Sequence, residues 1–240
     1  EVRRFMHFIN GFNQLFDGNN NEVIRNKYTE IKEFLANKKE GDMDNRDILT
    51  IKGLIRRGEA RTSCTFNQIP LSRCHFLDLP FYETGKIEKN PISEADIEIV
   101  LKLLREVQPH QIYVAGDLAD PHGTHRVCTD AVFAAVDVEK ENGAEWLKEC
   151  HIWMYRGAWA EWEIENIEMA VPFSPEELRE KRNSILKHQS QMESAPFLGN
   201  DERLFWQRSE DRNRGTASLY NQLGLACYEA MEAFVEYKPL

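Results

Sequence analysis

The chain has 240 residues, which suits one large domain, and its apolar fraction of 42% is ordinary for a folded core. Its 40 acidic against 30 basic residues give a formal net charge of −10. This excess of acid argues against nonspecific binding to nucleic acid or to an anionic membrane surface, because such binding needs clustered Lys and Arg. No apolar run is long enough to cross a bilayer, and no cleavable signal peptide is visible.

The cysteines point to a reducing compartment. The chain has five, which is an odd number, and they contain no C-x-x-C pair. Three of them lie inside apolar strand or helix patterns, so we interpret them as buried, reduced thiols that serve packing. This usage predicts a cytoplasmic protein.

The first 60 residues predict only helices. Apolar residues recur at helical spacing over 2–16, 22–36 and 48–55. The apolar run from Cys74 to Pro80 then predicts a short strand.

From residue 93 onward, strands and helices alternate. Ser93 with Asp96 three residues later predicts a capped helix start, and strands are predicted at 110–115 and 150–155 on either side of a helix over 124–141. A last strand is predicted at 169–172, a helix from Ser174 to Gln191, and two further helices near 201–208 and 216–235. This alternation predicts an α/β fold: three-layer and Rossmann-like, with a mostly parallel sheet and helices on both faces.

The predicted sheet has few strands for such a fold. Because the helical start contributes none and the chain opens on Glu1 rather than Met, we expect the first strand, usually the central one, to lie upstream. We therefore predict that 1–240 is a single, partial domain. It would have a helical amino-terminal segment over 1–60 and a helical carboxyl-terminal extension over 192–240.

The loop after the strand at 110–115 is the most informative segment. Asp120, His122 and His125 follow one another there, at the start of the predicted helix over 124–141. Residues just beyond the carboxyl end of an α/β strand line the crevice in which such sheets bind ligands. Two imidazoles and a carboxylate there would form half of a metal or acid/base site, and solvated loop histidines are the alternative.

Four segments, taken together, resemble the PIG-L/LmbE-like family of metal-dependent N-deacetylases. Arg56-Arg57-Gly58-Glu59-Ala60 resembles the family's R-x-x-E-A helix, although an ion pair within that helix is an alternative for Arg56 and Glu59. The passage over 99–114 resembles its helix, R-x-x-x-P and strand, and 120–126 resembles its D-x-H-x-D-H box. Lys181 to Gln191 resembles its late H-x-S-Q helix. Each segment alone is weak, but the ordered set is fairly specific.

Two features depart from the family pattern. The family's H-P-D-D motif, which supplies metal ligands and a catalytic Asp, has no match in residues 1–240. Thr124 also stands where the family usually has Asp, which puts a contact behind the metal site in doubt.

The resemblance implies a role for each candidate residue. His125 would bind zinc or another divalent metal, and a protonated His122 would stabilise the oxyanion formed during amide hydrolysis. Asp120 would orient His122, and Arg56 would hold a phosphate or hydroxyl group of an amino sugar. With one ligand of three, we expect the 240-residue chain alone to bind no zinc and to be inactive.

Three functions stay open. The first is a metal-dependent N-deacetylase acting on amino sugars. The second is part of a polypeptide whose main activity, glucosamine-6-phosphate deamination, belongs to a separate domain, because the chain resembles a version of the family fused behind such a domain. The third is a non-catalytic α/β module for binding or oligomerisation. We expect a small amino-sugar substrate, no nucleic acid and no membrane as partners, with a homo-oligomer as an open alternative.

Four aromatic residues in and after the strand at 150–155 are also open to interpretation: Trp153, Tyr155, Trp159 and Trp162. They could form a wall that stacks on a sugar, although core packing is favoured for Trp153. Trp159 and Trp162 lie in a more polar setting and are the better candidates for a rim.

Overall fold

A computed structural model describes residues 2–16, 20–39, 42–82, 90–116, 123–157, 161–192, 202–224 and 227–238. The chain divides into two compact units, Glu1–Phe76 with Asn183–Leu198 and Leu77–Arg182 with Gly199–Leu240. The single partial domain predicted over 1–240 stays a prediction. None of the described helices is both long enough and apolar enough to span a bilayer.

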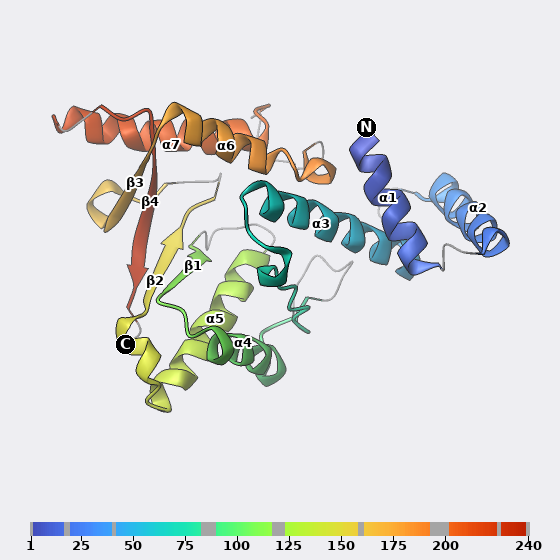
Figure 1. The fold of residues 1–240 in the computed structure, drawn as a ribbon, viewed down its shortest axis with the longest axis horizontal. Coiled ribbons are helices and arrows are strands. Elements are labelled where there is room, and N and C mark those ends of the chain that lie inside the picture. The colour runs from blue at the N-terminus through green and yellow to red at the C-terminus, as the bar shows by residue number, and fades with distance from the viewer. Residues whose placement is uncertain are drawn as a thin grey trace. The chain divides into compact units, whose positions relative to one another are not determined.

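The first unit is helical, as expected for the amino-terminal segment. Its helices are α1 (Val2–Leu15), α2 (Asn21–Asn37) and α3 (Arg46–Phe66), with the short 3-10 helices η1 (Leu71–Arg73) and η4 (Gln189–Gln191) (Figure 1). Asn20 and Asn45 cap α2 and α3, since the side chain of each accepts a backbone N–H from the first turn. The three helices share one apolar core, made of Phe12, Ile31, Ile48 and Ile51.

A glycine lets α1 approach α3 closely. A Cβ on Gly58 would lie 2.7 Å from the Nδ1 of His7, closer than side-chain atoms pack. His7 therefore packs against the backbone of α3 at this glycine, inside the R-x-x-E-A segment.

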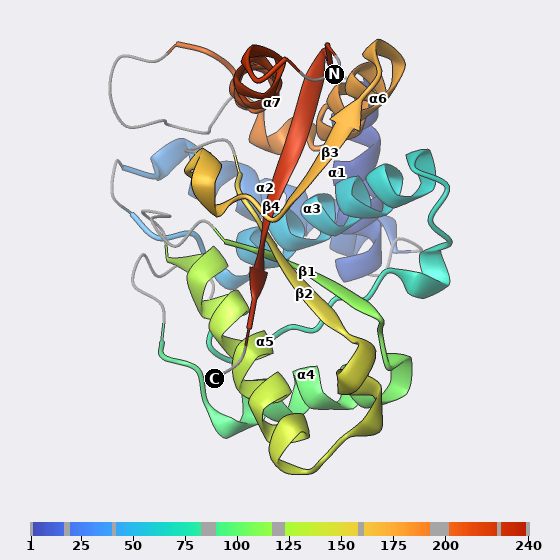
Figure 2. The ribbon, with the colours of Figure 1, turned by 90° about the vertical axis from the view of Figure 1, so that its left-hand side faces the viewer.

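The second unit contains the sheet. Its elements are α4 (Glu94–Val107), β1 (Gln111–Ala115), α5 (Thr124–Glu141), η2 (Glu145–Glu149), β2 (His151–Tyr155), η3 (Ile164–Asn166), β3 (Met169–Phe173), α6 (Pro175–Ile185), α7 (Phe205–Gln222) and β4 (Ala230–Tyr237). The strand order is β1-β2-β4-β3 (Figure 1), and Figure 2 shows the same strands after a 90° turn. β1 pairs with β2 in parallel, with Gln111 opposite His151, whereas β4 is antiparallel to both β2 and β3.

The core of this unit lies between α4, α5 and one face of β1 and β2. Its buried members come from all four elements: Val100, Leu101, Leu104, Val114, Ala131, Ala135, Val136 and Ile152. The start of α4 is a capping box, as the sequence predicts: the Asp96 side chain accepts from Ser93 N at 2.8 Å. Asp96 also accepts from Phe81 N at 2.8 Å, which fixes the preceding chain to the helix.

These observations confirm an α/β fold with a mixed sheet. Among the described strands, β1, β2 and β3 run in one direction, whereas β4 lies between β2 and β3 and is antiparallel to both. The predicted strand from Cys74 to Pro80 is wrong. Asp78 has a φ of +51°, which interrupts the extended backbone, and no described strand pairs with this segment. Its leucines, Leu77 and Leu79, still pack against the core.

The carboxyl-terminal region is not the helical extension expected over 192–240. The helix predicted over 216–235 ends at Gln222, and Gly224 follows with a φ of +77°. Residues 230–237 form β4, an interior strand. Met231, Phe234 and Val235 fit helical spacing, but the same segment also alternates between two faces, and pairing with β2 and β3 selects the strand. Similarly, α6 ends at Ile185 and not at Gln191.

β1 is an edge strand of the described sheet and borders an apolar groove. The groove has a volume of about 490 Å³. The segment Leu77–Leu79 lines one side of it, and Ile112–Val114 of β1 line another. Tyr113 is 49% exposed at this edge.

Candidate functional site

The carboxyl ends of β1 and β2 meet at one edge of the sheet because these two strands are parallel. Gly116, directly after β1, donates its N–H to the carbonyl of Tyr155 at 2.7 Å. Only glycine fits at this position, since a Cβ would lie 2.6 Å from Cζ2 of Trp162 and 2.8 Å from Cβ of Met154. This edge is the place where the sequence predicts a site.

Helix α5 begins at the same edge. Gly123, with a φ of +65°, precedes its first turn, and Thr129 donates its hydroxyl to the carbonyl of Ala115 at 2.8 Å. His125 lies in the first turn of α5 and its side chain is exposed. Asp120 and His122 lie outside the described residues.

Tyr155, considered in the sequence only as part of a sugar-stacking wall, lies at this edge. It ends β2, is 38% exposed, and has a pKa raised by burial and by the nearby Glu232 and Cys128. Cys128 lies three residues after His125 on α5. Tyr155 therefore presents a protonated phenol, a hydrogen-bond donor, close to the start of α5. A tyrosine at the end of a strand was the only local signal for it.

Trp162, a candidate for the rim of a sugar site, is half-buried and makes two contacts at this edge. The Arg156 guanidinium lies 3.9 Å from the centroid of the Trp162 ring, and the indole N–H donates to the Met154 carbonyl at 3.2 Å. One face of the ring is thus covered by a cation, so Trp162 serves the structure of the edge. Trp159 lies outside the described residues.

Behind Tyr155, a cluster of charged side chains, which we call the ionic cluster, joins α6, α7 and β4. Lys181 donates to Glu232 at 2.5 Å and to Asn213 at 2.6 Å. Arg212 donates to Glu161 at 2.7 Å and also pairs with Glu232. Arg212 is the most buried member, with 7% of its side chain exposed.

Within the ionic cluster, opposite charges counter the effect of burial on each pKa. Burial raises the pKa of Glu232, but Lys181 and Arg212 outweigh burial and hold that pKa below its usual range. Burial lowers the pKa of Lys181, and Glu232 opposes this effect. Two cations face two carboxylates, so we assign the cluster to fastening the helices to β4.

In the first unit, Glu59 and Arg56 have different environments. Glu59 is fully buried and accepts from the N–H of Ser190 at 2.7 Å and from its hydroxyl at 2.6 Å. The ion pair considered for Arg56 and Glu59 is therefore wrong, because neutral donors satisfy the carboxylate. Arg56 is exposed on α3.

The described residues do not by themselves fit a zinc ion. Among them, no three His, Cys, Asp or Glu side chains gather as a metal site requires. His125 supplies one imidazole, and a complete set of ligands would need residues from outside the described ones.

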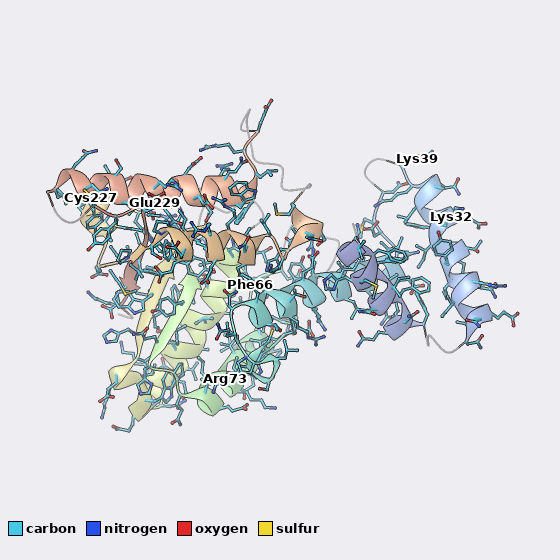
Figure 3. The ribbon with its side chains drawn as sticks, turned by 45° about the horizontal axis from the view of Figure 1, so that its top comes forward. Lys32, Lys39, Phe66, Arg73, Cys227 and Glu229 are labelled. Atoms are coloured by element: carbon cyan, nitrogen blue, oxygen red, sulfur yellow. The ribbon has the colours of Figure 1, made fainter. Side chains whose placement is uncertain are left out.

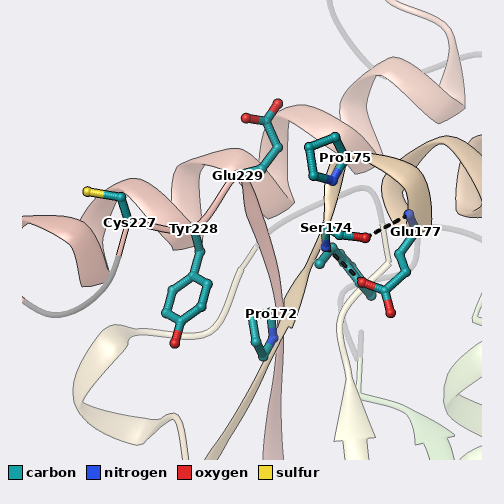
Figure 4. Close-up of a pocket in the computed structure, with 8 residues that line it drawn as sticks. Pro172, Ser174, Pro175, Glu177, Cys227, Tyr228 and Glu229 are labelled. Carbon is teal, nitrogen blue, oxygen red and sulfur yellow. Dashed lines mark hydrogen bonds between the residues drawn. The ribbon is translucent and has the colours of Figure 1, made fainter.

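A surface pocket at the far end of β3 carries no convergent chemistry. It is lined by Pro172, Ser174, Glu177, Tyr228 and neighbouring residues (Figure 4). Ser174 and Glu177 satisfy one another there, because Ser174 N donates to the Glu177 carboxylate at 2.8 Å and Glu177 N donates to the Ser174 hydroxyl at 3.2 Å. The start of α6 is thus already capped by its own acid.

Comparison with known proteins identifies a similar sequence and a weak likeness to a solved structure. No family model matches the chain. A protein of Bacteroides thetaiotaomicron named "Putative glucosamine-6-phosphate deaminase-like protein" is 82% identical over all 240 residues. The chain covers 36% of that relative, so it spans about a third of the relative's length. A crystal structure of the zinc-inhibited form of teicoplanin deacetylase Orf2 matches 82% of this chain and 77% of its own, with 14% identity. Its TM-score of 0.42 is too low to support an argument.

Proposed function

We propose that this chain is part of an enzyme acting on amino sugars, and that it contributes to hydrolysis of an N-acyl group. The ordered resemblance to PIG-L/LmbE-like deacetylases motivates the reaction class. The name of the Bacteroides relative, which refers to an amino-sugar phosphate, agrees with the substrate class.

The observation that carries this proposal is the contact between Glu59 and Ser190. These residues belong to two of the four resembling segments and lie 131 positions apart. Both oxygens of the buried carboxylate are used, at 2.7 Å and 2.6 Å. Segments that resemble one family and also touch are better support for the resemblance than either motif alone.

The proposed chemistry uses the residues that the resemblance implies. A protonated His122 would donate to the oxyanion formed when water adds to the amide, and Asp120 would orient its imidazole. His125 would contribute one metal ligand and Arg56 would hold a sugar phosphate or hydroxyl. Because the described residues lack a complete set of ligands, no reaction step is assigned to the metal.

We also propose that a strand from outside these 240 residues completes the sheet beside β1. The groove is lined mostly by apolar side chains, among them Leu77, Leu79, Ile112 and Val114, as the surroundings of a buried central strand require. The outer edge of β1 has no partner among the described strands. The greater length of the relative means that further chain is available in at least one similar protein.

A second candidate function is glucosamine-6-phosphate deamination by a separate domain of the same polypeptide. The relative's name favours it, and so does the small share of that relative that the chain covers. In this case the present chain would support the activity of the other domain or act beside it.

Two assays on the protein with its natural flanking sequence distinguish these functions. Acetate release from N-acetylglucosamine and its 6-phosphate tests the first, and ammonia release from glucosamine 6-phosphate tests the second. His122→Ala should reduce acetate release by about a hundredfold, the scale of one oxyanion donor. His125→Ala should reduce bound metal, and Arg56→Ala should raise KM.

Matched controls exist for each change. His110 is an exposed histidine before β1, and Arg46 is an exposed arginine at the start of α3. His110→Ala and Arg46→Ala should leave acetate release unchanged. Ammonia release without acetate release would favour the second function. The absence of both activities, in a protein that folds, would favour a non-catalytic module.

A further inference from the structure

Two thiols of the first unit are in contact. The sulfur atoms of Cys64 and Cys74 lie 3.7 Å apart, and both side chains are half-buried. Cys64 lies in the last turn of α3, and Cys74 follows η1 directly. No other pair of cysteines among the described residues makes such a contact.

The chain between the two cysteines forms a compact loop. Ile69 N donates to the Cys64 carbonyl at 2.8 Å, and Cys74 N donates to the Leu71 carbonyl at 3.1 Å. Phe66 and Arg73, both labelled in Figure 3, lie just inside the two ends of this loop. Because neighbouring backbone bonds fix both ends, the two sulfur atoms meet without a change of fold.

We propose that Cys64 and Cys74 form a reversible disulfide when the protein meets a peroxide, which makes this pair a site of oxidative modification. A disulfide needs its sulfur atoms at about 2.05 Å, so side-chain rotation with small backbone shifts must close the remaining gap. The segment from Cys74 to Leu79 belongs to no helix or strand, so a small shift there breaks no helical or sheet hydrogen bond.

The reaction balances with hydrogen peroxide as the oxidant. The Cys74 thiolate attacks one peroxide oxygen, the O–O bond breaks, and a sulfenic acid and water form after protonation. The Cys64 sulfur then attacks the sulfenic sulfur, the S–O bond breaks, and water leaves. Two thiols and one peroxide thus give one disulfide and two waters. Burial and the adjacent Cys74 raise the pKa of Cys64, so Cys64 is assigned the second, resolving attack.

The disulfide would tie the end of α3 to the segment that carries Phe76. The guanidinium groups of Arg57 and Arg61 each lie 5.3 Å from the Phe76 ring centroid, so this segment already packs on α3 through cations. Oxidation would add a covalent bond, the Cys64–Cys74 disulfide, to this non-covalent packing.

Peptide mapping tests the proposal directly. Trypsin cuts after Arg61, Arg73 and Lys86, which places Cys64 in peptide 62–73 and Cys74 in peptide 74–86. After treatment of the natively folded protein with about one equivalent of peroxide, we expect these two peptides to be linked in a non-reducing digest. Dithiothreitol should separate them. Over the same five cysteines, the count of free thiols should fall from five to three.

Single cysteine variants test whether Cys64 and Cys74 are the residues that form the disulfide. Cys64→Ser and Cys74→Ser should each abolish the linked peptides, and Cys150→Ser, which changes another half-buried thiol, should retain them. Oxidation that starts at the exposed Cys128 and Cys227, or that links two chains, would overturn the proposal. So would sulfinic acid at Cys74 with Cys64 still reduced, because a resolving thiol in contact should react first.

Discussion

Two buried acidic side chains, one from each unit, are satisfied in different ways. In the first, Glu59 is satisfied by two neutral donors of one residue, Ser190. In the second, Glu232 is satisfied by two cations, Lys181 and Arg212, which come from two helices. A carboxylate held by neutral donors needs only local geometry, whereas one held by cations makes its stability depend on charges that are themselves desolvated.

This difference can be measured because one probe reports on a single unit. All five tryptophans, at positions 146, 153, 159, 162 and 206, belong to the second unit. Tryptophan fluorescence during urea unfolding therefore follows that unit, while helical circular dichroism follows both.

The largest expected effect is that of Arg212→Met. The change removes the guanidinium that pairs with Glu161 and Glu232, in a setting where Arg212 is 7% exposed. Among the described residues, Lys181 still pairs with Glu232. Breaking a buried ion pair from one side costs about 3–5 kcal/mol, so the fluorescence transition should shift to much lower urea. Arg214→Met is the matched control, because Arg214 on the same helix pairs with Glu229 at the surface and should change stability by less than about 1 kcal/mol. Equal shifts for both variants would show that burial of the ionic cluster contributes nothing.

Glu59→Ala should have the next largest effect, and should act on the first unit. The change removes the carboxylate that accepts two hydrogen bonds from Ser190. The Ser190 N–H and hydroxyl then lose this acceptor. We expect a loss of about 2–3 kcal/mol in the circular dichroism transition, with the fluorescence midpoint unchanged. Ser190→Ala, which removes only the hydroxyl, should cost about 1 kcal/mol. A fluorescence midpoint that moves with Glu59→Ala would mean that the units unfold together, and the comparison would fail.

The contrast also explains what the sequence could predict. Ser93 and Asp96 are three residues apart, so their spacing alone predicts the start of α4. The R-x-x-E-A and H-x-S-Q segments identify Glu59 and Ser190, although not their contact. The ionic cluster has no such signal, because Lys181 and Glu232 are 51 positions apart. β4 is ambiguous for a related reason: its apolar residues fit two periods, and only pairing with distant strands decides between them.

Asp96→Ala tests whether the stability loss depends on the type of donor that satisfies a buried acid or on the unit that contains the acid. Asp96 belongs to the second unit but resembles Glu59, since it is fully buried and held by neutral donors, namely Phe81 N, Ser93 N and the Ser93 hydroxyl. We expect a loss of about 2 kcal/mol in the fluorescence transition, nearer to Glu59→Ala than to Arg212→Met.

Acid should remove the stabilisation that the Asp96 carboxylate provides. Burial raises its pKa, but the hydrogen bonds from Ser93 and Phe81 outweigh burial and hold the pKa below its usual range. A lowered folded pKa means that the stabilisation is complete above about pH 4 and is lost as the pH falls through the folded value. The difference in unfolding free energy between the protein and Asp96→Ala should therefore narrow as the pH falls below about 4 in urea titrations. A difference in unfolding free energy that widened in acid would mean that the folded protein holds the Asp96 carboxyl in its neutral form.

The smallest expected effect comes from an acid paired at the surface. Nδ1 of His151 lies 2.5 Å from the Glu236 carboxylate across β2 and β4, but the His151 side chain is 56% exposed. Water screens this pair on the side of the imidazole, and exposed pairs contribute about 0–1 kcal/mol. His151→Gln keeps a hydrogen-bond donor near Glu236 and should shift the fluorescence transition by less than about 0.5 kcal/mol. His151→Ala should shift it by no more than about 1 kcal/mol, and high salt should reduce that shift. A loss comparable to that of Arg212→Met would show that contact distance, and not burial, sets the energy of these carboxylates, which would reverse the ranking drawn from Glu59 and Glu232.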